Sequence, residues 1–224
     1  MNVEFSQQRV KMVDGQLRTT DVTSLPILDA MGAVPRELFV HEARRPLAYL
    51  DDDLEVAPAR NGAGPRYLME PSPFAKLLQL AEIRPTDSVL DVGTATGYSA
   101  AILSRLAASV VALESDVELA DAASAHLRQA GAENVTVVKG PLAAGHAAAG
   151  PYDVIVVEGA VGEMPQALFD QLKEGGRLVA VEGYGHAGTA RLYLKANGVV
   201  AGRRAFNAAV KPLPGFEKNP QFEF

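Results

Sequence analysis

The stretch Asp91-Val-Gly-Thr-Ala-Thr-Gly-Tyr98 decides the fold of this chain. It follows a short apolar run at 88–90 and opens a segment rich in Ala and Leu, which is typical of a helix. A second apolar run, 110–113, ends at Glu114. A strand, a glycine turn, a helix and a second strand that ends in an acid indicate a nucleoside-binding half-fold. Glycines let the backbone approach a ligand, the helix start offers free N–H groups, and the acid can accept hydrogen bonds from ribose hydroxyls.

The segments around this turn alternate between strand and helix patterns. Strands are expected at 88–91, 109–113, 135–139, 153–157 and 177–181, and helices at 73–81, 98–107, 117–130 and 164–172. This order predicts an α/β fold with a doubly wound, mostly parallel sheet covered on both faces. Two later apolar stretches, 190–195 and 199–206, are expected to close the sheet as antiparallel strands.

The N-terminal part of the chain lies outside this pattern. Residues 1–50 are expected to be helical, and 56–71 are rich in Pro and Gly and predict a loop. We therefore divide the chain into a helical segment with its loop, 1–72, and a cofactor-binding domain, 73–224, which together should form one compact unit. The end of the chain, 212–224, is expected to pack as an extended segment.

Composition excludes several classes of function. The 224 residues carry a net charge of -6 with no long basic run, which argues against a nucleic-acid partner. Cysteine is absent, and the four histidines make no metal-ligand spacing, so no metal site is expected. No apolar run reaches the roughly 18 residues of a membrane span, and the first residues lack a hydrophobic signal core, so we expect a cytoplasmic protein. Nothing indicates the oligomeric state.

The class of cofactor follows from the residues of the turn. A nicotinamide dinucleotide site has Gly-x-Gly-x-x-Gly, but Ala95 stands at the middle glycine position. The carboxylate of Asp91 would repel a pyrophosphate and attract a cationic amino-acid group. This favours S-adenosylmethionine, which carries an ammonium and a sulfonium and no phosphate, over a nicotinamide-dependent oxidoreductase. Close helix–strand packing is the purely structural alternative for the glycines.

Several blocks of the sequence resemble one known family. They are Met12-Val-Asp-Gly-Gln-Leu17, Ile27-Leu-Asp-Ala-Met31, Val34-Pro-Arg-Glu-Leu-Phe-Val40, Ala48-Tyr-Leu-Asp51, Val89-Leu-Asp-Val-Gly-Thr94, Gly97-Tyr98, Asn134-Val135, Pro151-Tyr-Asp-Val-Ile155 and Gln171-Leu-Lys-Glu-Gly-Gly-Arg-Leu-Val179. In these blocks the chain resembles class I methyltransferases, and specifically the protein-L-isoaspartate O-methyltransferases. The resemblance covers nearly the whole chain.

The resemblance implies a reaction and a set of cofactor residues. The family transfers a methyl group from S-adenosylmethionine to the α-carboxylate of an isoaspartyl residue in a damaged peptide or protein. The ester then cyclises to a succinimide that reopens partly to normal aspartate, which is protein repair. By resemblance, the cofactor-binding residues are Asp91, Gly93, Thr94, Gly97, Tyr98 and Glu114.

The chain departs from the family in its substrate loop. The family has Thr-Ile-Ser-Gln-Pro, whereas this chain, aligned on the proline, reads Tyr67-Leu-Met-Glu-Pro71. The serine position is therefore Met69, which cannot hydrogen-bond a carboxylate. The catalytic residue is unknown from the sequence, and the nearby candidates are Glu70, Ser72 and Arg66.

Two further departures lie after the third and fourth strands of the predicted domain. The family's Gly-Asp-Gly, whose acid contacts adenine, is replaced by Gly-Pro141-Leu, and a small or hydroxylated residue is replaced by Glu158. At an effective dielectric near 20, Glu70 and Glu158 would each oppose an anionic acceptor about 6 Å away by about 3 kcal/mol. Arg60 or Arg66 could offset this, unless all four side chains point into solvent. We therefore expect cofactor binding with weak or redirected acceptor specificity. A non-catalytic relative that binds the cofactor or a protein partner is the alternative.

Overall fold

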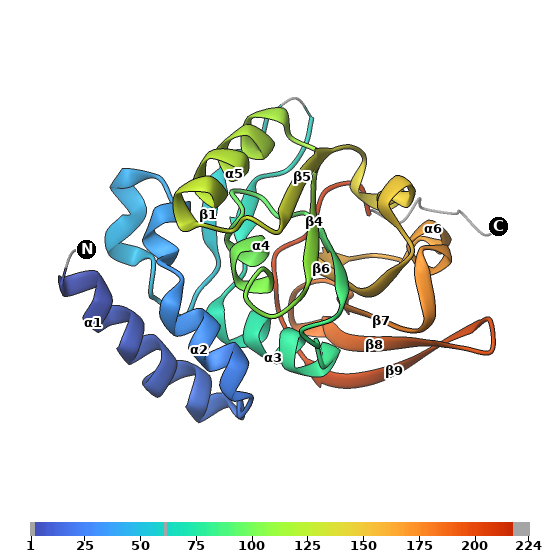
Figure 1. The fold of residues 1–224 in the computed structure, drawn as a ribbon. Helices are drawn as coiled ribbons and strands as arrows, with labels where there is room; N and C mark the ends of the chain where they lie inside the picture. The colour runs from blue at the N-terminus through green and yellow to red at the C-terminus, as the bar shows by residue number, and fades with distance from the viewer. Residues whose placement is uncertain (1–2, 61, 217–224) are drawn as a thin grey trace.

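A seven-stranded sheet forms the centre of the molecule in the computed structural model, which describes residues 3–60 and 62–216. Its strands, in spatial order, are β5 (Val135–Lys139), β4 (Ser109–Glu114), β3 (Ser88–Val92), β6 (Tyr152–Val161), β7 (Leu172–Glu182), β8 (Thr189–Ala196) and β9 (Val199–Asn207). The strands from β5 to β7 run parallel, and β8 and β9 are antiparallel additions at one edge. This confirms the predicted doubly wound α/β fold (Figure 1).

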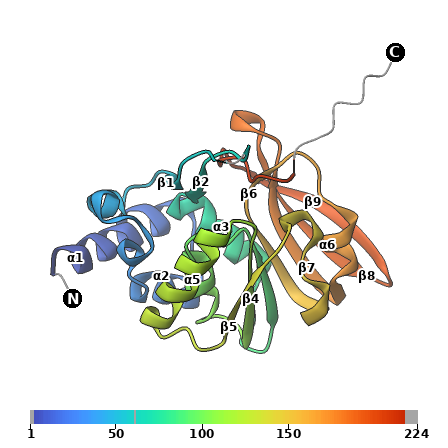
Figure 2. The ribbon, with the colours of Figure 1, turned by 90° about the horizontal axis from the view of Figure 1, so that it is seen from above.

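Helices cover both faces of the sheet. The α-helices are α1 (Val3–Met12), α2 (Leu25–Ala33), α3 (Pro71–Ala81), α4 (Tyr98–Leu103), α5 (Val117–Ala130) and α6 (Gln166–Asp170), and shorter helical turns are Val13–Leu17, Arg18–Thr20, Arg36–Phe39, Glu42–Leu47, Leu142–Ala144, Ala147–Ala149 and Gly185–Ala187. Figure 2 shows the N-terminal helices gathered with α3 and α5, away from α6. The expected N-terminal helical extension is therefore present.

Alternation along the strands divides the core in two. In β3, Val89 belongs to the cluster beneath the N-terminal helices, whereas Leu90 and Val92 belong to the cluster beneath α6. Asp91 shares the face of Val89, because successive side chains of a strand point to opposite sides. The pleat of β3 therefore directs the Asp91 carboxyl toward α4 and away from the α6 side.

The order in which strands are added to the sheet changes direction at β3. The chain continues outward to β4 and β5 and then returns to the other side of β3 as β6. Ligands of open α/β sheets bind beyond the carboxyl ends of strands at such a switch point. Two extra residues of β6 between the pairs Val156–Val179 and Ala160–Val181 form a bulge that contains Glu158. Both the glycine turn and Glu158 therefore lie at the edge of the sheet where a ligand is expected.

Most predicted elements agree with the structure in kind and place, but several differ in extent. The strands β6 and β7 run well beyond the expected 153–157 and 177–181. The helix expected at 98–107 ends at Leu103, and the one expected at 164–172 covers only Gln166–Asp170. The segment 56–71 is not simply a loop, because its ends belong to a two-stranded hairpin of β1 (Leu54–Ala57) and β2 (Arg66–Leu68). The buried side chains of Leu54 and Leu68 pair across this hairpin and anchor it to the core. We name it the β1–β2 arm.

The predicted boundary at residue 72 falls inside α3, so the division into 1–72 and 73–224 stays a prediction. One hydrophobic cluster includes Leu17 and Phe39 from the first part and Tyr98 from the second. The tail is described as far as Phe216, which is buried, and its expected continuation over 217–224 lies outside the described residues.

Candidate functional site

The glycine turn joins β3 to α4 with a backbone that requires glycine twice. Gly93 has φ of 88° and Gly97 has φ of 97°, which is the left-handed region that side chains disfavour. A Cβ at Gly97 would also lie 3.2 Å from the Cβ of Ala123 in α5. Part of the glycine signal is therefore structural, since Gly97 serves close packing of the turn on α5.

Two carboxyl groups meet beside this turn without a cationic partner in contact. Asp91 is fully buried, and its Oδ2 accepts a hydrogen bond of 2.7 Å from the Ser99 hydroxyl. Within the described residues, Oδ1 of Asp91 and the buried Oε1 of Glu158 have no hydrogen-bond partner. Burial raises the pKa of Asp91 to about 7, and burial together with the nearby Asp91 raises that of Glu158 well above its usual range. This end of the site is suited to a cation.

A third carboxyl group, Glu114 at the end of β4, has the opposite environment. Its side chain is fully buried and forms a two-pronged ion pair with Arg66 of the β1–β2 arm, in which Nη2 lies 2.8 Å from Oε2. Three backbone N–H groups also donate to it, those of Ala95, Ser115 and Asp116, at 2.8, 2.8 and 3.0 Å. The oxygens of Glu114 are therefore already saturated with hydrogen-bond donors.

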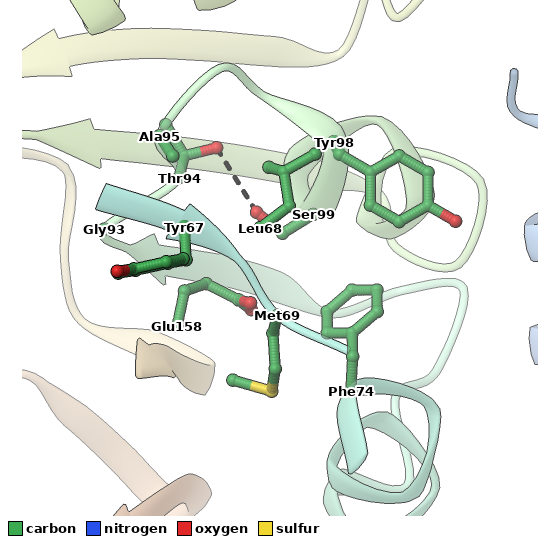
Figure 3. Close-up of a pocket in the computed structure, with 10 residues that line it drawn as sticks. All are labelled: Tyr67, Leu68, Met69, Phe74, Gly93, Thr94, Ala95, Tyr98, Ser99 and Glu158. Carbon is green, nitrogen blue, oxygen red and sulfur yellow. Dashed lines mark hydrogen bonds between the residues drawn. The ribbon is translucent and has the colours of Figure 1, made fainter. Parts of the chain in front are cut away.

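A small cavity lies between the glycine turn and the β1–β2 arm. It holds about 10 Å³, which is room for roughly one water molecule. Its walls are Tyr67, Leu68, Met69, Phe74, Gly93, Thr94, Ala95, Tyr98, Ser99 and Glu158. Figure 3 shows β2 running across the turn, with Glu158 between Tyr67 and Met69. We call this the deep cavity.

The segment around Leu213, near the end of the described chain, packs against the glycine turn. Leu213 donates its N–H to the carbonyl of Ala160 in β6 at 2.9 Å, and Pro212 bridges to the same residue. A Cβ added to Gly93 would lie 2.8 Å from Cδ1 of Leu213, and one added to Gly159 would lie 2.9 Å from its Cβ. Leu213 therefore packs directly on the turn, and these glycines make that close contact possible.

The six predicted cofactor residues are gathered at one edge of the sheet. Gly93, Thr94 and Tyr98 line the deep cavity, Asp91 is bonded to its wall through Ser99, and Gly97 begins α4. Glu114 is adjacent, bonded to the Ala95 amide, but its oxygens are taken by Arg66. The cofactor roles of these residues stay predictions.

Met69, Glu70 and Ser72 of the substrate loop lie in different surroundings. Met69 lines the deep cavity, as its place in the family pattern requires. Ser72 donates its hydroxyl to Asp51 at 2.8 Å and is outside the cavity wall. The carboxyl of Glu70 is half-buried near the acidic turn 51–53, and burial and these three aspartates raise its pKa to about 7. Of the two glutamates expected near an acceptor, only Glu158 reaches the cavity.

The arginines proposed to offset these acids are engaged elsewhere. Arg60 pairs with Asp116 at 2.6 Å and with Glu118, and Arg66 pairs with Glu114. The alternative that all these side chains point into solvent is wrong for Arg66, which is buried, and for Oε1 of Glu158.

Sequence reasoning gave no role to Arg36 and Ser99. Arg36 is completely buried, donates to the carbonyl of Met69 at 2.9 Å, and lies 4.7 Å from the ring centre of Tyr98. Its charge lowers the pKa of Glu158, though less than burial raises it. An arginine in the mostly apolar block 34–40 was the available signal. Ser99 follows the turn directly and gave none.

Residues 3–60 and 62–216 hold no cluster of three or more possible metal ligands. No helix in that same part is long and apolar enough to cross a membrane.

Comparison with known proteins agrees with the geometry. At 42% identity, a protein-L-isoaspartate O-methyltransferase of Koribacter versatilis aligns with 78% of this chain and 76% of its own length. One of Methanoculleus marisnigri is 39% identical over 79% of this chain and 78% of its own.

Solved structures give the same fold. A structure of a protein-L-isoaspartate O-methyltransferase superposes with a TM-score of 0.80 at 28% identity, covering 93% of this chain and 67% of its own. A Plasmodium falciparum structure titled as a putative enzyme of this kind in complex with S-adenosyl-L-homocysteine has a TM-score of 0.77 at 18% identity, covering 92% and 98%. The family described as protein-L-isoaspartate(D-aspartate) O-methyltransferase matches residues 7–214. This match spans nearly the whole chain, so the protein belongs to that family.

Proposed function

We propose that this protein transfers a methyl group from S-adenosylmethionine to the α-carboxylate of isoaspartyl residues in damaged peptides or proteins. One observation carries the proposal: in a chain of this family, the switch point of the sheet holds buried oxygens of Asp91 and Glu158 that have no hydrogen-bond partner among residues 3–60 and 62–216. Buried carboxyl oxygens without donors are costly, so a site that has two of them is built for a positively charged ligand.

The residues present fit the cofactor at its cationic end. Asp91, with Glu158 beside it, would hold the amino-acid group, and the turn from Gly93 would let the backbone approach it. Glu114 is the last residue of β4, the second strand of the nucleoside-binding half-fold, and an acid at that position can bind ribose hydroxyls. The cofactor, when bound, supplies an activated methyl group. No acid for the adenine is present after β5, where the chain has Pro141.

The chain's own contribution to the reaction is position and exclusion of water. A carboxylate is already a nucleophile, so no general base is required and alignment dominates. The β1–β2 arm, with Met69 in the serine position, forms the acceptor side of the deep cavity. Arg36, fixed on the Met69 carbonyl, is the buried cation that favours a negative charge there.

A second function is favoured by the same wall of the cavity. Met69 offers no hydrogen bond to an acceptor carboxylate, and Glu158, once ionised beside a bound cation, opposes its charge. These two residues favour a cofactor-binding relative whose methyl-acceptor activity is lost or redirected to another group. The cytoplasmic location expected from the sequence stays a prediction.

The test is a transfer assay with labelled S-adenosylmethionine and two peptides that differ only in one L-isoaspartyl or L-aspartyl residue. Label that appears as a base-labile ester on the isoaspartyl peptide alone supports the proposal. Label on neither peptide, at enzyme concentrations that bind the cofactor, would leave the redirected relative as the better interpretation.

A further inference from the structure

Arg66 occupies the position that a ribose would take if Glu114 binds its hydroxyls. It reaches from the β1–β2 arm to Glu114 with both guanidinium prongs, and its Nη2 also donates to the carbonyl of Gly93 at 3.1 Å. Both side chains are buried, with side-chain exposures of 6% for Arg66 and 0% for Glu114. A guanidinium therefore lies between the acid and the glycine turn, where a nucleoside would have to enter.

The acid has no capacity left for another ligand. An ionised carboxylate offers about four lone-pair positions. Glu114 receives two prongs of Arg66 and three backbone N–H groups, so the two hydroxyls of a ribose could bind only after Arg66 leaves.

Arg66 also separates two cavities. On one side is the deep cavity of about 10 Å³, whose wall includes Gly93. On the other is a rim cavity of about 390 Å³, lined by Arg66 itself and by Arg60, Ser115, Asp116, Glu118 and Pro214, among others. The rim cavity is open enough to receive the displaced guanidinium. Asp116 and Glu118 lie on its wall and already pair with Arg60, so Arg66 would share these carboxylates with Arg60. A long arginine side chain can make this move without refolding the backbone.

We propose that Arg66 is an internal competitor of the cofactor: it plugs the ribose position in the free protein and swings into the rim cavity when the nucleoside binds. This inference rests on the proposed function, because it takes the cofactor to be S-adenosylmethionine. The plugged state lowers the apparent affinity by the fraction of molecules that are open. Cofactor binding thereby breaks the ion pair that joins the β1–β2 arm to the end of β4.

The test is calorimetric titration with S-adenosylhomocysteine, which lacks the sulfonium charge and so reduces direct repulsion by the arginine. Arg66→Ala should bind at least tenfold more tightly than the unaltered protein. Arg44→Ala is the matched control, since Arg44 pairs with Glu55 of the same arm at 3.6 Å in an exposed position and should leave the affinity unchanged. Arg66→Gln, which keeps one possible donor to Glu114, replaces Arg66→Ala should the latter fail to fold.

Each outcome decides the matter. Equal or weaker binding by the Arg66 variant overturns the competitor role while leaving the proposed function intact. If neither the unaltered protein nor the variant binds S-adenosylhomocysteine at millimolar concentration, the protein does not use this cofactor. Both the competitor role and the proposed function are then overturned. A second measurement follows the Nη–H signals of Arg66 by NMR in the unaltered protein, since these groups donate to Glu114 and Gly93. Ligand should accelerate their exchange with water, and signals that stay protected at saturation contradict displacement.

Discussion

The two ends of the site treat their carboxyl groups in opposite ways. Asp91 and Glu158 each have a buried oxygen to which no group in the described part of the chain donates, whereas Glu114 is saturated by Arg66 and three amides. All three acids lie near one turn, and all border the same switch point of the sheet. A ligand gains at the first end by supplying missing charge. At the second end it must displace what is already there.

This difference separates two parts of cofactor recognition. At the unpaired end, the buried carboxyl oxygens of Asp91 and Glu158 destabilise the free protein, and binding of a cation relieves this cost. At the saturated end, the ion pair of Arg66 with Glu114 stabilises the free protein, and a ligand must first break this pair. Affinity is then the balance of the two ends, and the variants below change one end at a time.

The largest effect should come from breaking the saturated end. Glu114→Ala leaves the guanidinium of Arg66 buried and unpaired, and we expect a loss of about 3–5 kcal/mol in the free energy of unfolding. Arg66→Ala should cost less, because three amides still donate to Glu114. Denaturant titration measures both. Asp121→Asn is the control: it removes an exposed ion pair with Lys139 and should cost about 0–1 kcal/mol. Equal costs for the Glu114 and Asp121 variants would contradict the buried pair.

The unpaired end should make stability fall as pH rises. The pKa of Asp91 is about 7 in the fold and near 3.8 when unfolded, because burial disfavours its charge. The folded state thus keeps a proton that the unfolded state loses. This stabilisation is complete below pH 4 and is lost as pH rises to about 7, by roughly 2–4 kcal/mol. Urea titrations of the free protein between pH 4.5 and 8 measure it. Asp91→Asn should flatten the slope, and an unchanged slope in that variant would assign the effect to other groups.

Glu158 tests whether the unpaired end also opposes the acceptor. With cofactor bound its carboxylate faces an anionic isoaspartyl group, so Glu158→Gln should lower KM for an isoaspartyl peptide about tenfold, or 1.4 kcal/mol. The exposed Glu163 supplies the control Glu163→Gln, which should change nothing. Steady-state methylation over a range of peptide concentrations gives KM and kcat separately. A fall in kcat with KM unchanged would mean that Glu158 acts on the cofactor and not on the acceptor.

The sequence predicts one end of this comparison better than the other. Asp91 and the glycines follow a strand in a local pattern, and the α/β alternation places them at the sheet edge, so their position is readable from period and spacing. The pairing of Arg66 with Glu114 joins residues that no local pattern connects. It depends on how the β1–β2 arm folds over the sheet, and the pattern of 56–71 predicts only a loop. The same holds for Glu158, whose direction is set by a bulge in β6.

The smallest effect concerns the acceptor wall itself. Met69 lines the deep cavity at the family's serine position, so Met69→Ser should restore a hydrogen-bond donor and raise kcat/KM for isoaspartyl peptide a few-fold, about 1 kcal/mol. The gain is limited because replacing the buried methionine with the smaller serine leaves a void. Glu70→Gln should add little, because Glu70 is outside the cavity wall and adjoins the acidic turn 51–53. Comparing both single variants with the double variant assigns the gain. If only Glu70→Gln raises activity, the acceptor lies on the side of the acidic turn and not in the deep cavity.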